Sequence, residues 1–290
     1  MWRVDRQWGA YRYILPFLAA EALIVGIPLA TGFFYSFFKA DYFQITDWRG
    51  LENYRLVLFS STVLKSFLIT TIFAIFALFF TFLSGFSLAL FLNRDTRMHI
   101  FVRAVVLVPY TISMLVGSLL LKWMFSSDAG LLHLATAPLG LSGASPMSDP
   151  EGAMAALVFN AVWRDSAFAM ILLMAGLKSI DPQLYAAARI DGAGALYRFR
   201  RLTLPMMRVP ILITLVRLLI HFVNVLTYPL VLTGGGPNGT TSTIGLVVYH
   251  IGFSDYRTGQ ANALACLVFA FNMILIALLL RLFRQRGGAA

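Results

Sequence analysis

The sequence predicts an all-α fold: a polytopic membrane protein with six transmembrane helices and a structured cytoplasmic loop. Three observations support this prediction. Apolar residues make up 59% of the 290 residues and charged residues only 12%, against about 45–50% and about 25% in an ordinary soluble domain. Six apolar segments approach or exceed the roughly 20 helical residues that cross a hydrocarbon core. The basic residues lie in the short segments between these runs, as is typical of membrane proteins.

Each predicted span is an apolar run with few charged interruptions. Glu21 interrupts the first run, Arg164 and Asp165 interrupt the fourth, and Arg217 and His221 lie within the fifth. The first run exceeds the 7–15 residues of a signal-peptide core, so we expect an uncleaved first helix. The six predicted spans are Tyr13–Phe38, Ser66–Asn93, Ala104–Leu121 with an extension past Lys122, Gly152–Leu177, Pro210–Leu232 and Thr258–Leu280.

The charges of the linkers predict the orientation of the spans. The N-terminal segment, the second and fourth linkers and the C-terminal tail are rich in Arg, whereas the third linker, Phe125–Glu151, has neither Arg nor Lys. Basic segments stay on the cytoplasmic side, so we expect both termini to be cytoplasmic. The predicted organisation is a cytoplasmic N-terminus (1–12), a transmembrane domain (13–286) with a structured loop at 179–210, and a C-terminal tail (287–290).

Several classes of function are disfavoured by the composition. The net charge of +10 does not indicate nucleic acid, because the basic residues are dispersed between apolar runs. The single cysteine, Cys266, permits no disulfide within the chain and no cysteine-based metal site. We find no Gly-x-x-x-x-Gly-Lys-Ser/Thr loop for phosphates and no catalytic Ser, His or Asp arrangement. The sequence therefore predicts no catalytic residue, no metal ligand and no cofactor held by this chain.

The fourth linker carries the clearest local signals. It exceeds the usual 2–8 residues of a connection within a helix bundle. Asp181 is a good N-cap and Pro182 suits the first helical position, while Gly192 can end a helix in the left-handed conformation. Leu184–Ile190 is rich in Ala, which favours helix. The two predicted helices are Leu184–Ile190 and Ala195–Leu202.

Physical reasoning leaves two roles open for this pair of short helices. A compact basic amphipathic segment can dock into the groove of a partner protein. The same segment can also lie along the lipid headgroups. The two roles are about equally supported by the physics of the segment alone.

The stretch LYAAARIDGAGALYRFRRLTLP, Leu184–Pro205, resembles the EAA loop of binding-protein-dependent ABC importer permeases. In that family a Glu-Ala-Ala stretch precedes an Asp-Gly-Ala stretch, with a Phe and a Leu-Pro further on. Ala186 stands where the family has Glu, whose carboxylate often helps to hold the loop to the ATPase. The resemblance implies that the loop couples the bundle to an ATPase through Leu184, Ala186, Ala187, Ala188, Ile190, Asp191, Gly192 and Ala193.

The resemblance extends over nearly the whole chain. Asn160–Pro182, Val231–Thr243 with its Gly-Gly-Pro, and Leu107–Leu132 are similar to sugar permeases of the maltose-permease type. This resemblance implies the transmembrane domain of a type I ABC importer in a bacterial inner membrane, with a carbohydrate or carbohydrate-like solute. It also implies four kinds of partner: a second, homologous permease, two cytoplasmic ABC ATPase subunits that bind the ATP, a solute-binding protein, and membrane lipid.

Polar groups at membrane depth are costly and usually face the interior of the bundle. Sugars bind through hydrogen-bonding groups and stacking aromatic rings, so the predicted solute residues are Asn160, Trp163, Asp165, Asn224 and Tyr228. For each of them, a hydrogen bond between helices or an anchoring role at the membrane interface is the alternative.

Arg217 raises a further alternative. An Arg that faces the solute path would favour an anionic sugar derivative, whereas an Arg near the start of its span can extend its side chain toward the headgroups. The main rival to an ABC importer is an ion-coupled secondary transporter. Such a protein would be expected to carry paired acidic residues at mid-membrane, where only Glu21 and Asp165 qualify.

Overall fold

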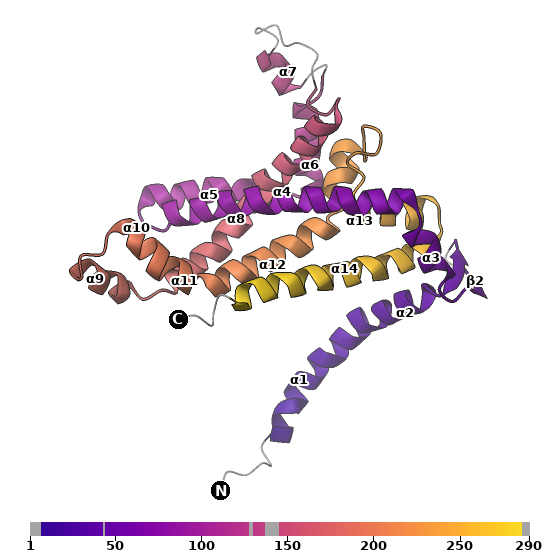
Figure 1. The fold of residues 1–290 in the computed structure, drawn as a ribbon, viewed down its shortest axis with the longest axis horizontal. Helices are drawn as coiled ribbons and strands as arrows, with labels where there is room; N and C mark the ends of the chain where they lie inside the picture. The colour runs from indigo at the N-terminus through magenta and orange to yellow at the C-terminus, as the bar shows by residue number, and fades with distance from the viewer. Residues whose placement is uncertain (1–6, 43, 128–129, 137–144, 286–290) are drawn as a thin grey trace. The chain divides into compact units, whose positions relative to one another are not determined.

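The computed structural model describes residues 7–42, 44–127, 130–136 and 145–285 (Figure 1). The predicted tail at 287–290 and the first six residues lie outside this range. Within the described residues, five helices are long and apolar enough to cross a membrane, and a bent helix pair makes a sixth candidate. The five are Tyr13–Tyr35, Ser61–Phe91, Pro150–Lys178, Arg208–Thr233 and Thr258–Phe283.

The third span is predicted to be one continuous helix, and the structure differs from this prediction. It consists of α5 (Arg97–Thr111) and α6 (Met114–Met124), which are bent by 93° relative to each other. Ile112 and Ser113 between them are extended, with ψ of 142° and 139°. Pro109 in the last turn of α5 has no N–H to donate to the helix. The apolar run alone could not reveal this bend, because hydropathy does not depend on backbone direction.

The chain divides into two compact units, the first formed by Met1–Val63 and Val248–Ala270. This unit contains a feature that an all-α prediction missed, an antiparallel hairpin in the first linker. Asn53 holds the hairpin by donating to the carbonyl oxygens of Ser36 and Phe38 at 2.9 and 2.8 Å. Its elements are α1 (Gln7–Glu21), η2 (Ala22–Gly26), α2 (Ile27–Tyr35), β1 (Phe38–Asp41), β2 (Gln44–Trp48), α3 (Glu52–Leu58) and η6 (His250–Ser254).

The second unit, Leu64–Val247 with Phe271–Ala290, holds the helices that position the site. Apart from α5 and α6, its elements are α7 (Leu131–Thr136), α8 (Pro150–Lys178), α9 (Pro182–Ile190), α10 (Ala195–Arg198), η4 (Phe199–Thr203), α11 (Leu204–Met206), α12 (Arg208–Asn224) and η5 (Pro229–Thr233). Three helices contribute to both units: α4 (Ser61–Phe91), α13 (Ile244–Tyr249) and α14 (Thr258–Gln285).

Helix α8 is the central helix of the second unit, and side chains along its length, such as Leu157, Met170 and Leu173, are fully buried. Two glycines permit close approach. A Cβ on Gly85 of α4 would lie 2.5 Å from the Cβ of Ala169, and one on Gly176 would lie 2.5 Å from the Cβ of Pro210. Both distances are below what real side chains tolerate. Small residues are what let helix backbones pack closely in a membrane.

The fifth predicted span also contains a break. Helix α12 ends at Asn224, where Val225 takes φ −65° and ψ 122°. Helical structure then resumes and leads into η5 at Pro229. Asn224 and Tyr228 therefore lie on opposite sides of an irregular backbone segment inside an apolar span.

Candidate functional site

Helix α9 and the turn after it form the segment that the sequence singled out. Asp181 is extended, and its carboxylate accepts a hydrogen bond from the backbone N–H of Gln183 at 2.8 Å, as an N-cap does. After α9, Gly192 takes φ +76°, and the backbone N–H of Ala193 donates to the carbonyl oxygen of Ala188 at 2.9 Å. The predicted helix, its cap and its glycine terminus are all confirmed.

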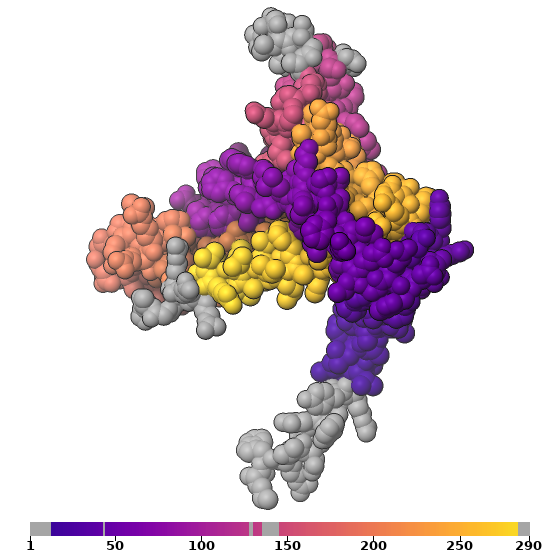
Figure 2. Space-filling model, turned by 45° about the vertical axis from the view of Figure 1, so that its right-hand side comes forward, coloured from indigo at the N-terminus to yellow at the C-terminus, as the bar shows by residue number. Residues whose placement is uncertain are grey.

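The coupling segment, Ser179–Met207, presents an apolar surface. Ile190 is 87% exposed and Leu196 and Tyr197 are each 62% exposed. In Figure 1, α9 extends past the ends of α8 and α12, and Figure 2 shows the same segment as a projecting lobe. Of the predicted coupling residues, Leu184, Ala187, Ile190, Asp191 and Gly192 are exposed, and Ala186, Ala188 and Ala193 are half-buried.

One contact braces the coupling segment internally, and another attaches it to the bundle. The hydroxyls of Tyr185 on α9 and Thr203 on η4 lie 2.9 Å apart. The ring of Phe199 lies 6.2 Å from that of Phe86 on α4. The lobe is therefore fixed to the helices rather than suspended from a loose linker.

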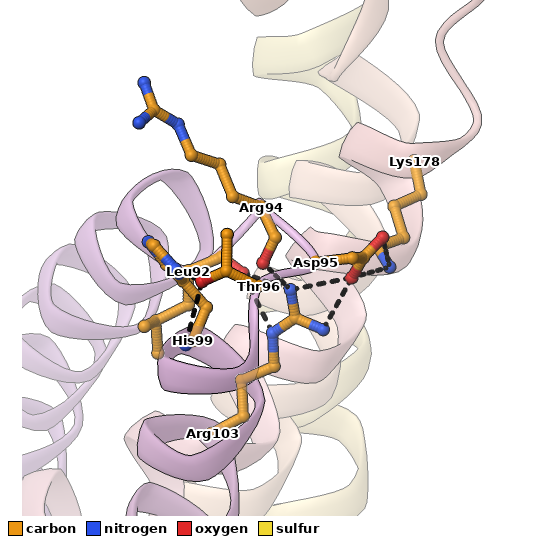
Figure 3. Close-up of polar contacts among 7 residues, drawn as sticks. All are labelled: Leu92, Arg94, Asp95, Thr96, His99, Arg103 and Lys178. Atoms are coloured by element: carbon orange, nitrogen blue, oxygen red, sulfur yellow. Dashed lines mark hydrogen bonds and ion pairs between the residues drawn. The ribbon is translucent and has the colours of Figure 1, made fainter.

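A cluster of charges joins the end of α8 to the loop between α4 and α5 (Figure 3). The ammonium group of Lys178, the last residue of α8, lies 2.9 and 3.1 Å from the two carboxylate oxygens of Asp95. The guanidinium of Arg103 lies 3.0 Å from the same carboxylate and also donates to the carbonyl oxygens of Leu92 and Arg94 at 2.8 and 2.6 Å. Arg103 thus satisfies carbonyl groups left free where α4 ends.

A second cluster lies inside the bundle around Asp165, which is 3% exposed. The hydroxyl of Tyr228, which is fully buried, donates to one carboxylate oxygen at 2.7 Å. The imidazole Nε2 of His221 lies 3.3 Å from that oxygen, and the Arg164 guanidinium lies 3.4 Å from the other. One carboxylate therefore connects α8, α12 and the segment that leads into η5.

Arg164 also supports the bend of the third span. Its guanidinium donates to the carbonyl oxygens of Tyr110 and Ile112 at 3.3 and 3.4 Å. Backbone carbonyls that leave a helix at membrane depth need another donor, because the hydrocarbon supplies none. The Arg164 guanidinium therefore interacts both with the Asp165 carboxylate and with the backbone carbonyls at the bend.

The remaining polar candidates are separated from this cluster. Asn160 is 1% exposed and donates to the hydroxyl of Ser118 on α6 at 2.9 Å. Trp163 faces the same helix, with its ring 3.5 Å from where a Cβ of Gly117 would lie. Asn224 is exposed on α12, and its side-chain oxygen lies 3.3 Å from the amide nitrogen of Asn272 on α14.

Comparison with known proteins places this architecture in a family. Residues 81–286, which include the coupling segment and both polar clusters, match the family described as binding-protein-dependent transport system inner membrane component. The chain belongs to this family. Membership makes it a multi-pass membrane protein of a transport system that uses a binding protein, and it favours an importer permease over an ion-coupled secondary transporter.

Relatives of this inner membrane component match it along almost its whole length. It is 31% identical over 271 residues to the sulfoquinovosyl glycerol transport system permease protein of Agrobacterium fabrum, covering 91% of this chain and 87% of that one. It is 30% identical over 277 residues to the trehalose/maltose transport system permease protein of Thermococcus litoralis, covering 95% and 94%. A bacterial ABC transporter that imports the acidic polysaccharide alginate contains a chain of the same fold, with a TM-score of 0.84, 22% identity and 97% of each chain covered.

Sequence reasoning missed several residues of the permease that the structure brings together. Asp95 went unnoticed among the basic residues of the second linker, although an acidic residue in a basic linker was a usable signal. The stacking of Tyr110 on Phe168, whose ring centroids lie 5.5 Å apart, could not be found either, because the two residues are distant in the sequence.

The charge cluster at Asp95 predicts a pH dependence. Lys178 and then Arg103 hold the pKa of the Asp95 carboxyl below its usual value, which is about 3.9. A lowered pKa in the folded state stabilises the protein above the unfolded-state pKa, and that contribution is lost as the pH falls through the folded-state pKa. We expect the melting temperatures of the wild type and Asp95→Asn to differ at pH 7 and to converge below about pH 3.9.

Thermal unfolding in nanodiscs between pH 3 and pH 8 tests this prediction. Asp95 and Lys178 are solvent-exposed, so 1 M salt should also shrink the difference, because the range over which exposed charges act falls to about 3 Å at this ionic strength. Glu52→Gln, in the exposed pair with Arg49, is a control at a site remote from Asp95 in sequence. A constant difference across the whole pH range would contradict the prediction.

Proposed function

We propose that this chain is the membrane-spanning permease of an ATP-binding-cassette importer that moves a carbohydrate or carbohydrate-like solute into a bacterial cytoplasm. The observation that carries the proposal is the exposed apolar surface of the coupling segment. A side chain such as Ile190, 87% exposed beside a basic helix pair, fits the groove of a partner protein. Relatives that match almost the whole chain are named as permeases for sugars or sugar derivatives, and these names support a carbohydrate solute.

In this proposal an ATPase subunit receives α9 and moves it. The ATPase binds and hydrolyses the ATP, and the permease performs no bond chemistry. The Tyr185–Thr203 contact passes the movement of α9 to η4, and from there it reaches the bundle through Phe199 and Phe86. The short connection to α8 is a second route. The Asp95–Lys178 contact carries the same movement to α4 and α5. Such a shift of packed helices as rigid bodies is a known form of conformational switching.

We further propose the assembly and its orientation. Two permeases, of which the second is a different, homologous chain, combine with two ATPase subunits and receive solute from a binding protein on the outer face. The coupling segment and both termini face the cytoplasm. The basic linkers support this orientation, because Arg and Lys accumulate on the cytoplasmic side.

For the solute path, the exposed face of α12 is our first assignment. Asn224 is exposed there; its amide nitrogen donates to the carbonyl oxygen of Ile220 at 2.7 Å and its oxygen accepts from Asn272 at 3.3 Å, so its second N–H and its remaining lone pair are what it offers to a sugar hydroxyl. Asn160, Asp165 and Tyr228 are buried and Trp163 packs on α6, so their contact with solute requires the helices to separate. In the conformation described here, these buried groups hydrogen-bond within the protein.

Reconstitution tests the proposal. The complex is purified from native membranes through a tag on this chain, placed in proteoliposomes and supplied with its binding protein and a panel of labelled sugars. We expect uptake to require ATP on the coupling-segment side and to survive ionophores that collapse ion gradients. Uptake that continues without ATP and stops with the ionophore would reject the importer in favour of ion coupling.

A further inference from the structure

Two arginines and two aromatic rings form a stacked row inside the second unit. The Arg164 guanidinium lies 4.9 Å from the ring centre of Tyr110, and the Arg217 guanidinium lies 5.3 Å from that of Phe168. The two rings stack on each other with centroids 5.5 Å apart. The row draws its members from α5, α8 and α12. Contacts of this geometry attract a cation to the face of a ring.

The two arginines of this row differ in how their charge is compensated. Arg164 lies beside Asp165 and donates to two backbone carbonyls, and its side chain is only 12% exposed. Arg217 is exposed, and no carboxylate among the described residues lies within ion-pair distance of it. The ring of Phe168 holds the Arg217 guanidinium in place but does not neutralise it.

Arg217 and its ring partner lie well away from the ends of the helices that carry them. Arg217 lies nine residues after the start of α12, or about 14 Å along the helix. Phe168, which the guanidinium contacts, lies ten residues before the end of α8, or about 15 Å along that helix. These distances are about half of the roughly 30 Å thickness of a hydrocarbon core, so the charge lies well inside an apolar span rather than at its end.

An uncompensated arginine at this depth must face a polar cavity or a partner rather than lipid, because a charge in hydrocarbon is costly. The face of α12 that carries Arg217 continues to His221 and Asn224, since positions four and seven further on lie on one side of a helix. Asn224 is exposed and lies about 10 Å from Arg217 along the axis. This face therefore presents a cation at one point and an amide at another.

We propose that Arg217 binds an anionic group of the transported solute, so that the substrate class is an acidic carbohydrate derivative with a carboxylate, sulfonate or phosphate. The guanidinium is a planar fork of donors that matches the oxygens of such groups. Asn224 hydrogen-bonds to hydroxyls elsewhere on the same solute. This inference rests on the proposed function and specifies the solute of that same path.

The experiment uses the intact complex in proteoliposomes with its binding protein and ATP. The probes are matched pairs: glucose with glucuronate and glucose 6-phosphate, and galactobiose with digalacturonate. We expect the wild type to take up at least one acidic member at ten times the rate of its neutral counterpart or more. Arg217→Gln should lower that ratio at least tenfold, and Arg217→Lys, which keeps the charge without the fork, should have an intermediate effect.

Arg208→Gln is the matched control, because it removes the same charge from an exposed position at the start of the same helix. It should leave the ratio unchanged. Melting of each variant in nanodiscs identifies any that fails to fold, and Arg217→Lys then carries the comparison, since it preserves the cation.

The remaining outcomes separate this inference from the proposed function. Uptake of neutral sugars with a ratio that Arg217→Gln leaves unchanged overturns the inference while the importer stands. Equal loss of acidic and neutral uptake in a folded Arg217→Gln complex assigns the residue to an interface with the second permease and also overturns it. Absence of ATP-driven uptake for every sugar in a competent, binding-protein-stimulated complex rejects the carbohydrate importer itself.

Discussion

Replacing Gly192 with proline is expected to abolish transport and to uncouple ATP hydrolysis from the solute. Gly192 takes φ +76°, whereas proline is locked near −65°. Its N–H also donates to the carbonyl oxygen of Arg189 at 3.1 Å, and proline has no N–H. Proline at an incompatible position costs more than about 1 kcal/mol, and each 1.4 kcal/mol changes an equilibrium about tenfold. We expect solute-stimulated ATPase activity and uptake to fall to about a tenth or less of wild type.

Two alanine substitutions distinguish the effect of backbone conformation from the effect of a steric clash. A Cβ at Gly192 or at Gly194 would meet nothing within 4 Å, so neither alanine clashes. Gly194 has φ −65°, which alanine adopts readily, so Gly194→Ala should transport normally. Gly192→Ala should be impaired to a smaller degree than Gly192→Pro. Full activity of a well-expressed Gly192→Pro complex would remove the coupling role from this turn.

Asp165→Ala is expected to destabilise the folded permease by about 3–5 kcal/mol, the cost of breaking a buried charge pair from one side. The substitution leaves the Arg164 guanidinium without its carboxylate and the buried hydroxyl of Tyr228 without its acceptor. The loss is measured as a lowered unfolding free energy or melting temperature in nanodiscs. Transport should fall with it, because α8, α12 and the segment leading into η5 lose their common contact.

Two further substitutions distinguish the parts of this cluster. Tyr228→Phe removes only the hydrogen bond to the carboxylate, worth about 1.5–3 kcal/mol when one partner is charged, and keeps the ring. Asp165→Asn keeps an acceptor for Tyr228 but removes the charge beside Arg164, so it should fall between the other two. If Asp165→Ala melted like the wild type, the carboxylate would not hold these helices together.

The parts of the fold that follow from periodicity and local chemistry could be predicted from the sequence. The apolar runs gave the spans, and Asp181, Pro182 and Gly192 defined α9 within two residues at its start, because capping depends on neighbours along the chain. The coupling residues themselves remain predictions, since no partner is present to contact them. Asn224 is the predicted solute residue that the structure exposes.

Features that depend on contacts between distant residues could not be predicted. The bend at Ile112 is supported by Arg164, fifty-two residues later in the chain, and no local signal connects them. The same is true of the contact between Asp95 and Lys178. It is also true of the hairpin in the first linker, where Asn53 donates hydrogen bonds to two backbone carbonyl oxygens. A single sequence lists these groups without revealing which of them meet.

The length of α8 has a mechanical consequence. Asp165 lies thirteen residues before Lys178, so about 20 Å of rigid helix separates the carboxylate from the end nearest α9. A tilt of about 10° about that end would carry Asp165 sideways by about 3.5 Å on this 1.5 Å per residue rise. No hydrogen bond to Tyr228 survives such a displacement. Either the Tyr228 hydroxyl moves together with the Asp165 carboxylate, or each tilt of α8 breaks this hydrogen bond and the return movement re-forms it.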